Sequence, residues 1–324
     1  MKAATYERYG PPEVVEIRNV PTPTLGAGEV LIRIHASTVS TGDWRERSLA
    51  MPAGFGPFGR LVFGVTRPRQ PILGSELAGV VEAVGAGVTS FRVGDDVFAF
   101  ANAKMGSHAE FRVFPASGLI ARKPGNLSHE QAAALSFGGM TMLGFFRRGS
   151  LAEGERVLVN GASGSVGSAA VQIARHLGAE VTAVCGPTNV ELVRGLGAHR
   201  VIDYTREDFT TNGVQYDVIV DTVGNANYAR VKGSLATRGR LLAVLGGFMD
   251  LVLAPAIRMR GEHRVIAGPS VVTVEDIRRL AELAAGGAFT PVIDQVYPLS
   301  QIVEAHRRVE SGHKRGSVVV AIAA

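Results

Sequence analysis

The segment from Arg156 to Gly167 constrains the fold more than any other part of the chain. It reads Arg-Val-Leu-Val-Asn-Gly-Ala-Ser-Gly-Ser-Val-Gly. The apolar, β-branched run Val157–Val159 predicts a strand that is buried on both faces. The apolar spacing of Ser165–Leu177 predicts a helix, and small residues fill the turn between the two. Strand, glycine turn and helix in this order are typical of a doubly wound α/β domain with a parallel sheet.

The turn itself predicts a dinucleotide site. Ala162, Gly164 and Gly167 occupy the three glycine positions of G-x-G-x-x-G, the first as alanine. Bare backbone at Gly164 lets a pyrophosphate approach, Gly167 lets the helix pack on the strand, and the first helical N–H groups attract the phosphates. The alternative is a turn that only connects strand and helix. The expected phosphate-binding residues are Ala162, Ser163, Gly164, Ser165, Val166 and Gly167.

Alternating strands and helices follow this unit, whereas the first 120 residues are β-rich. Five further strands are predicted at Glu180–Cys185, Arg200–Ile202, Asp217–Asp221, Arg240–Leu245 and Arg264–Ala267. Short β-branched runs punctuated by glycine and proline predict a barrel-like domain in residues 1–120. Within it, residues 45–70 are predicted to be a long connection, either a lid over a cleft or an insertion without function. The tail reads strand, helix, strand and is expected to rejoin the barrel.

Composition narrows the class of protein. A length of 324 residues suggests about two domains. The single cysteine, Cys185, excludes an internal disulfide and a cysteine-based zinc site, and it favours a reducing compartment, so we expect a cytoplasmic protein. Met1–Arg8 lacks the apolar core of a signal peptide, and the apolar stretch Leu241–Ile257 is interrupted and short for a membrane span. The net charge is +5, but the basic residues are scattered, so we expect no nucleic-acid partner.

Several stretches together resemble the zinc-independent medium-chain dehydrogenase/reductases of the quinone oxidoreductase type. The stretches are 1–15, 72–79, 84–97, 157–167, 201–204 and 312–320. The resemblance implies an α/β protein with a GroES-like β-barrel domain (1–124 and 290–324), a Rossmann NADP-binding domain (125–289), a substrate cleft at their junction and a homodimer. Zinc-dependent members place a Cys near position 40 and a His after Gly74. Ser40 and Ser75 stand there in this chain, so we expect no metal.

The coenzyme is expected to be NADPH, with NADH possible. An Asp or Glu at the end of the second strand would bind the ribose of NAD and repel a 2′-phosphate, but Cys185 and Thr188 stand in this stretch. The resemblance implies Tyr204 as a binding residue, and Arg194 is a further candidate unless it is only a solvated helix residue. Leu245 and Gly246, at the end of the fifth strand, are expected at the nicotinamide ribose unless they form only a turn. The resemblance also implies a contact from Ser317.

The resemblance implies hydride transfer from NADPH to a quinone or an activated alkene such as an enone. Ser40 is the first candidate donor to the acceptor carbonyl, followed by Thr141 or a water molecule, and the resemblance also implies that Thr141 meets the nicotinamide. For each an alternative stays open: Ser40 caps its own turn, or Thr141 bonds to its own helix backbone. Two other functions stay open as well. One is an NADPH-dependent carbonyl or alcohol oxidoreductase of a secondary-metabolite substrate, and the other is a non-catalytic NADPH-binding or RNA-interacting protein.

Overall fold

The computed structural model describes residues 1–51 and 54–322 of the chain. The chain forms two compact units. The first unit consists of the described residues 1–51, 56–137 and 273–322, and the second of 138–272 with 54–55. Among the described residues, no helix is both long and apolar enough to cross a membrane.

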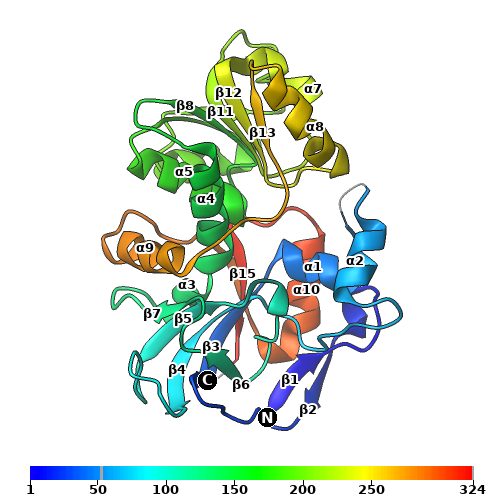
Figure 1. The fold of residues 1–324 in the computed structure, drawn as a ribbon, viewed down its shortest axis with the longest axis vertical. Helices are drawn as coiled ribbons and strands as arrows, with labels where there is room; N and C mark the ends of the chain where they lie inside the picture. Colours follow the sequence, from blue (N-terminus) through cyan, green and yellow to red (C-terminus); the bar gives the residue numbers. More distant parts are fainter. Residues whose placement is uncertain (52–53, 323–324) are drawn as a thin grey trace. The chain divides into compact units, whose positions relative to one another are not determined.

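The first unit is built on a mainly antiparallel sheet with the strand order β14-β15-β3-β4-β5-β7, with β6 paired to β3 (Figure 1). The C-terminal strand β15 pairs with β3, Val318 opposite Val39, so the tail rejoins the first domain as predicted. The strands of this unit are β1 (Lys2–Thr5), β2 (Glu16–Asn19), β3 (Glu29–Val39), β4 (Glu76–Val84), β5 (Asp96–Phe100), β6 (Phe111–Pro115), β7 (Ile120–Arg122), β14 (Ile293–Pro298) and β15 (Ser317–Ala321).

Helices in this unit correct one prediction. Residues 45–70 were predicted to be a long connection, but the structure forms α1 across residue 45 and α2 within the segment. Ser40 and Asp43 form a reciprocal capping box that starts α1. The helices of the unit are α1 (Thr41–Ser48), α2 (Gly56–Phe63), α3 (His129–Ala133), α9 (Val274–Ala285) and α10 (Ile302–Glu310), with short 3₁₀ turns at Pro12–Val14, Asn102–Lys104 and Leu299–Gln301.

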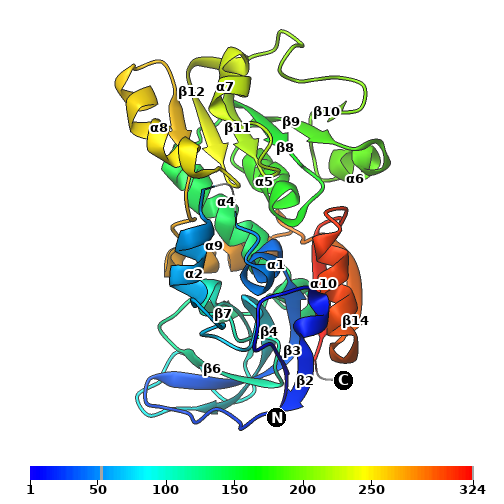
Figure 2. The same ribbon diagram turned by 90° about the vertical axis from the view of Figure 1, so that its right-hand side faces the viewer.

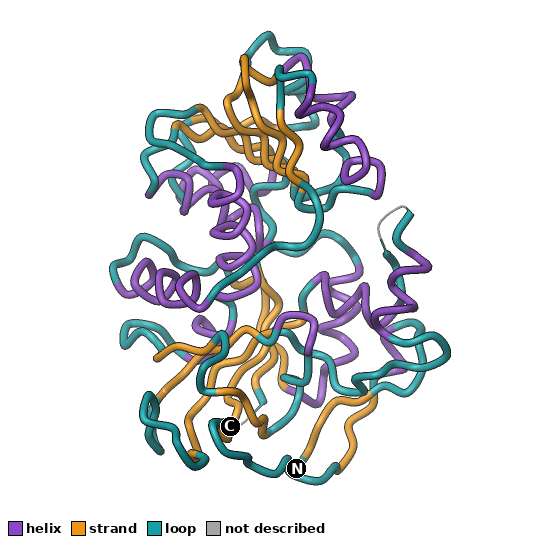
Figure 3. The backbone as a smooth tube through the Cα atoms, viewed as in Figure 1, coloured by secondary structure: helices purple, strands orange, loops and turns teal. Residues whose placement is uncertain are grey.

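The second unit is a parallel sheet in the order β10-β9-β8-β11-β12-β13, with helices on both faces (Figure 1, Figure 2). Counted along the unit this is 3-2-1-4-5-6, the order of a doubly wound dinucleotide-binding sheet. Its strands lie together in one layer (Figure 3). They are β8 (Arg156–Asn160), β9 (Glu180–Cys185), β10 (Arg200–Asp203), β11 (Tyr216–Asp221), β12 (Leu235–Ala243) and β13 (Arg264–Ile266).

The helices of the second unit are α5 (Ser165–His176), α6 (Val190–Gly195), α7 (Tyr228–Val231) and α8 (Phe248–Met259), together with α4 (Ser136–Gly149), which starts in the first unit. Short 3₁₀ turns lie at Pro187–Asn189 and Lys232–Ser234. All the predicted strands of this unit are present. The fifth differs in extent: β12 runs from Leu235 to Ala243 rather than from Arg240 to Leu245, and the Val244 N–H, which donates to the Asp221 carbonyl, also donates to the Leu242 carbonyl, at 3.1 Å, where the chain turns.

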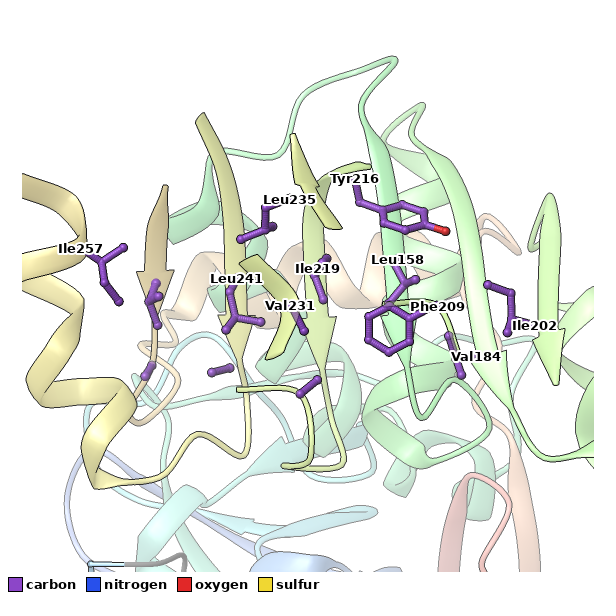
Figure 4. Close-up of a cluster of buried hydrophobic side chains, with 14 residues drawn as sticks. Leu158, Val184, Ile202, Phe209, Tyr216, Ile219, Val231, Leu235, Leu241 and Ile257 are labelled. Atoms are coloured by element: carbon purple, nitrogen blue, oxygen red, sulfur yellow. The ribbon is translucent and has the colours of Figure 1, made fainter. Parts of the chain in front are cut away.

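Apolar side chains on one face of this sheet explain why these strands form. Leu158, Ile219 and Leu241, from three neighbouring strands, are fully buried in one cluster (Figure 4). Val231 and Phe209, from the connections that cross this face, close the cluster. The hydrophobic cluster therefore packs against the middle of the sheet, and the carboxyl ends of the strands remain available to form the site.

Candidate active site

The glycine turn lies at the carboxyl end of β8, and its glycines have different reasons to be small. A Cβ on Gly167 would lie 2.1 Å from the Gly161 carbonyl oxygen, so Gly167 is required for α5 to pack on the turn. A Cβ on Gly164, the N-cap of α5, would meet only that same oxygen at 3.6 Å. Packing within the chain therefore does not require Gly164, and the space beside it is open to a ligand.

The N-terminus of α5 supplies the donors that a phosphate needs. The first N–H groups of a helix have no intrahelical acceptor and lie at its positive end. Gly161 and Ala162 anchor the turn because both N–H groups donate to the Val184 carbonyl, at 3.1 and 3.0 Å. On the side of β9, Asn189 Nδ2 donates to Ser163 Oγ at 3.2 Å. Ser165, Val166 and Gly167 form the first turn of α5. The predicted phosphate-binding residues are thus adjacent around one helix terminus.

The predicted adenosine-end residues gather near the end of β9, except for Arg194. Cys185 is the last residue of β9, and burial raises the pKa of its thiol to about 11. Thr188 is exposed in the following turn. Tyr204 donates its N–H to the Cys185 carbonyl at 3.2 Å, and a Cβ on Gly186 would lie 3.3 Å from its phenol oxygen. Arg194 instead pairs with a glutamate on its own helix, α6.

A pocket of about 530 Å³ opens beside this turn. It is lined by Pro187, Val190, Val201, Asp203, Thr205 and Arg206. Hydrogen bonds from the backbone and hydroxyl of Thr205 hold the pKa of the Asp203 carboxyl below its usual range. Arg206 Nε lies 3.9 Å from Asp203 Oδ2, and its side chain is 87% exposed. Sequence reasoning missed Arg206, although a basic residue two positions after Tyr204 was a usable signal.

The predicted nicotinamide-end residues of the second unit lie on α4 and after β12. Thr141 is a buried residue of α4. Leu245 and Gly246 follow the end of β12, and a Cβ on Gly224 would lie 3.3 Å from the Leu245 carbonyl oxygen. The structure therefore brings the segment after β12 next to the loop after β11, both at the carboxyl edge of the sheet.

Ser40 and Ser317 lie in the first unit. Ser40 is 5% exposed, donates its hydroxyl to Asp43 Oδ2 at 2.6 Å and caps α1. This geometry matches the capping alternative, and a catalytic role of Ser40 stays a prediction. Ser317 is the buried first residue of β15, and its N–H donates to the Val292 carbonyl at 2.8 Å.

The residues at the expected zinc positions do not fit a zinc ion. Ser40 is occupied in its capping box, and Ser75 Oγ is buried and has no hydrogen-bond partner in the described part of the chain. Neutral hydroxyls are poor zinc ligands beside thiolate, imidazole or carboxylate groups. Within residues 1–51 and 54–322, no group of three or more His, Cys, Asp or Glu side chains could hold a metal ion.

Comparison with known proteins identifies the family. The model of the alcohol dehydrogenase GroES-like domain matches residues 26–153, and the model named zinc-binding dehydrogenase matches residues 196–320. A mitochondrial NAD(P)H oxidoreductase of Mus musculus is 32% identical over 369 residues, which cover 99% of this chain and 89% of the relative. The chain belongs to the zinc-independent, quinone oxidoreductase-like medium-chain dehydrogenases/reductases.

Two further comparisons support membership of this superfamily. A 2-methylene-furan-3-one reductase of Solanum lycopersicum is 31% identical over 332 residues, 99% of this chain and 79% of the relative. The solved structure of a quinone oxidoreductase from Coxiella burnetii has a TM-score of 0.87 at 26% identity, with 100% of this chain and 99% of that chain covered. A third model, the C-terminal domain of a DNA/pantothenate metabolism flavoprotein, matches residues 153–233. The predicted fold, a GroES-like domain plus a Rossmann sheet, is confirmed.

Proposed function

We propose that this protein is a zinc-independent, NADPH-dependent oxidoreductase that transfers hydride to a quinone or an enone. The observation that carries the proposal is the open position at Gly164, at the N-terminus of α5 in a sheet of Rossmann order. Relatives named NAD(P)H oxidoreductase, quinone oxidoreductase and alkenal/one oxidoreductase support an oxidoreductase with a nicotinamide coenzyme. When bound, that coenzyme supplies the hydride, and the chain's residues bind and orient it.

The preference for NADPH rests on the charges around the end of β9. The stretch from Cys185 to Thr188 has no carboxylate that would repel a 2′-phosphate, and the Asp203 carboxylate of the adjoining pocket is paired with Arg206. Arg206 lines the pocket next to this turn, and Tyr204 lies over Gly186. We propose that Arg206, Tyr204 and Thr188 bind the 2′-phosphate, with NADH as a weaker coenzyme. Arg194 contributes less because it is paired more closely with Glu191 than Arg206 is with Asp203, at 3.9 Å.

The remaining assignments belong to the same proposal. Ser40 is the first candidate donor to the acceptor carbonyl, followed by Thr141 or a water molecule, and Thr141 is the candidate to meet the nicotinamide. A donor at that carbonyl would stabilise the enolate that forms as hydride arrives. Leu245, Gly246 and Ser317 would line the nicotinamide end. We propose that the coenzyme-binding domain spans residues 125–289, of which 138–272 belong to the second unit, and that the protein is cytoplasmic.

Turnover tests the proposal directly. We expect NADPH to be oxidised by members of a quinone and enone panel, faster than NADH, at the same rate with and without a strong chelator. Cofactor absorbance would be followed with each acceptor, with simple aldehydes as a third class. Activity that chelator abolishes would refute the metal-free mechanism. Turnover of aldehydes alone would favour the carbonyl reductase alternative, and tight NADPH binding with no turnover would favour the non-catalytic one.

We also propose that the protein forms a homodimer, and that the dimer interface covers α8 and the outer edge of β13. Met249, Val252 and Met259 of α8 are 61%, 49% and 81% exposed, and β13 ends the sheet. Exposed apolar patches and unpaired strand edges mark association sites. We expect light scattering to give a dimer for the native chain and mainly monomer for Val252→Glu. Val93→Glu, at a 61% exposed site in the first unit, should stay dimeric. A monomeric native chain would contradict the proposal.

A further inference from the structure

A buried carboxylate lies where the strand order of the second unit reverses. Asn160 and Asp221 are the last residues of β8 and β11 and are register partners. From β8 the chain continues to β9 on one side, and from β11 it continues to β12 on the other. Asn160 is 6% exposed and Asp221 is 2% exposed. Ligands of doubly wound sheets bind at this reversal, so the pair lies at the sheet edge where a coenzyme is expected.

The Asp221 carboxylate collects backbone donors from the loop that follows β11. Oδ1 accepts from the N–H groups of Val223 and Gly224, each at 3.1 Å. Oδ2 accepts from Gly224 at 3.1 Å and from Ala226 at 3.0 Å. In the part of the chain that the structure describes, no lysine or arginine pairs with this carboxylate. Charge-assisted hydrogen bonds therefore offset the cost of burying the charge, and the loop is fixed to Asp221 as a result.

Asn160 fastens the same loop from the neighbouring strand. Its side-chain Nδ2 donates to Asp221 Oδ1 at 2.9 Å and to Asn225 Oδ1 at 2.7 Å. Its backbone carbonyl accepts from Thr222 Oγ1 at 2.8 Å. These hydrogen bonds from the ends of β8 and β11 therefore hold residues 222–226 in one conformation.

The fixed loop lies against the glycine turn, and Thr222 Oγ1 donates to the Gly161 carbonyl at 3.3 Å. Gly161 has a φ of +83°, and a Cβ there would lie 2.5 Å from Val223 Cγ2 and 2.6 Å from Thr222 Oγ1. In turn, the Gly161 carbonyl oxygen lies 2.1 Å from the position that a Cβ of Gly167 would take. Two consecutive close contacts therefore connect the loop to the first turn of α5. Moving the loop would move the groups that receive the phosphates.

We propose that Asp221 is a positioning residue of the coenzyme site. Its carboxylate fixes residues 222–226, these hold Gly161 in its left-handed conformation, and the turn thereby keeps its phosphate-binding shape before the coenzyme arrives. A site that is already shaped loses less free energy to ordering on binding. The inference deepens the proposed function and rests on it.

Asp221→Asn tests this role, because it preserves size but places an NH₂ group among amide donors. From the loss of charge-assisted hydrogen bonds we expect the Kd of NADPH to rise by about 10- to 100-fold by calorimetry. We expect the stoichiometry to stay near one per chain, and both kcat at saturating NADPH and the KM of the quinone to stay close to native. A merely structural role would lower the stoichiometry or the Tm and leave the Kd of the folded fraction unchanged.

Two more variants keep the inference testable. Asp276→Asn removes a carboxylate of similar burial, 8% exposed, that caps α9 in the first unit, and it should lower the Tm without changing the Kd of NADPH. Thr222→Val keeps the shape of the loop but loses its bond to Asn160, and it should raise the Kd by a smaller factor even if Asp221→Asn does not fold. Native Kd values in Asp221→Asn and Thr222→Val would overturn the positioning role. A native protein that binds neither NADPH nor NADH would overturn the proposed function instead.

Discussion

Gly164→Asp should weaken NADPH binding by about 100-fold or more, because it places a carboxylate where helix-terminal N–H groups would otherwise receive the pyrophosphate. The fold should not suffer. Gly164 has φ −77°, which any residue adopts, and its Cβ would meet only the Gly161 carbonyl at 3.6 Å. Aspartate is also a favoured N-cap and lies at the positive end of α5. We therefore expect an unchanged or slightly higher Tm together with a loss of coenzyme affinity.

Because Gly164→Asp is expected to lower coenzyme affinity without lowering the Tm, measuring both distinguishes a binding role of Gly164 from a structural one. Calorimetry with NADPH and thermal unfolding would be run on the native chain, Gly164→Asp and Gly233→Asp. Gly233 has no heavy atom within 4 Å of its Cβ position, lies in the second unit and is away from the turn in sequence, so it adds the same charge as a control. Native affinity in Gly164→Asp would show that the phosphates do not rest on this turn, and a large drop in its Tm would show that Gly164 is needed for the fold.

The sequence predicts the parallel sheet well because the information is local. Strands β8, β9 and β11 are short apolar runs buried on both faces, and each is bounded by polar residues or glycine. Helix α1 shows the reverse case. Its residues read Thr-Gly-Asp-Trp-Arg-Glu-Arg-Ser, and it buries Asp43, Glu46 and Arg47. A helix that buries charged side chains lacks the helical spacing of apolar residues, so the sequence pattern did not predict α1.

The residues of the candidate site likewise differ in how far the sequence alone predicts them. The glycine turn is contiguous in sequence, and its residues are adjacent in the structure. The Asn160–Asp221 pair joins residues 61 positions apart, and its contact depends on β8 and β11 being neighbours. No spacing in a single sequence signals that pairing. Asn189 was likewise missed, since its bond to Ser163 joins two turns 26 positions apart.

The buried acid Glu46 should make the stability of the native chain fall as pH rises. Glu46 is 2% exposed, Tyr6 donates to its Oε1 at 3.5 Å, and its Oε2 has no hydrogen-bond partner among the residues that the structure describes. Burial, and secondarily the nearby Asp43 carboxylate, raise the pKa of Glu46 from 4.5 to about 8. Between these values the folded chain binds more protons at this group than the unfolded chain. The free energy of unfolding therefore decreases with pH across this window.

Glu46→Gln should remove that dependence, because glutamine resembles the protonated acid and does not titrate. One pKa unit corresponds to about 1.4 kcal/mol, so the variant should gain on the order of 3 kcal/mol relative to the native chain between pH 5 and pH 8. Denaturant unfolding at a series of pH values gives this difference directly. Glu76, whose pKa burial also raises to about 8, is present in both proteins and cancels. Glu191→Gln, at a side chain that is 84% exposed, should follow the native pH profile. A difference between Glu46→Gln and the native chain that stays constant with pH would mean that Glu46 ionises normally in the folded protein.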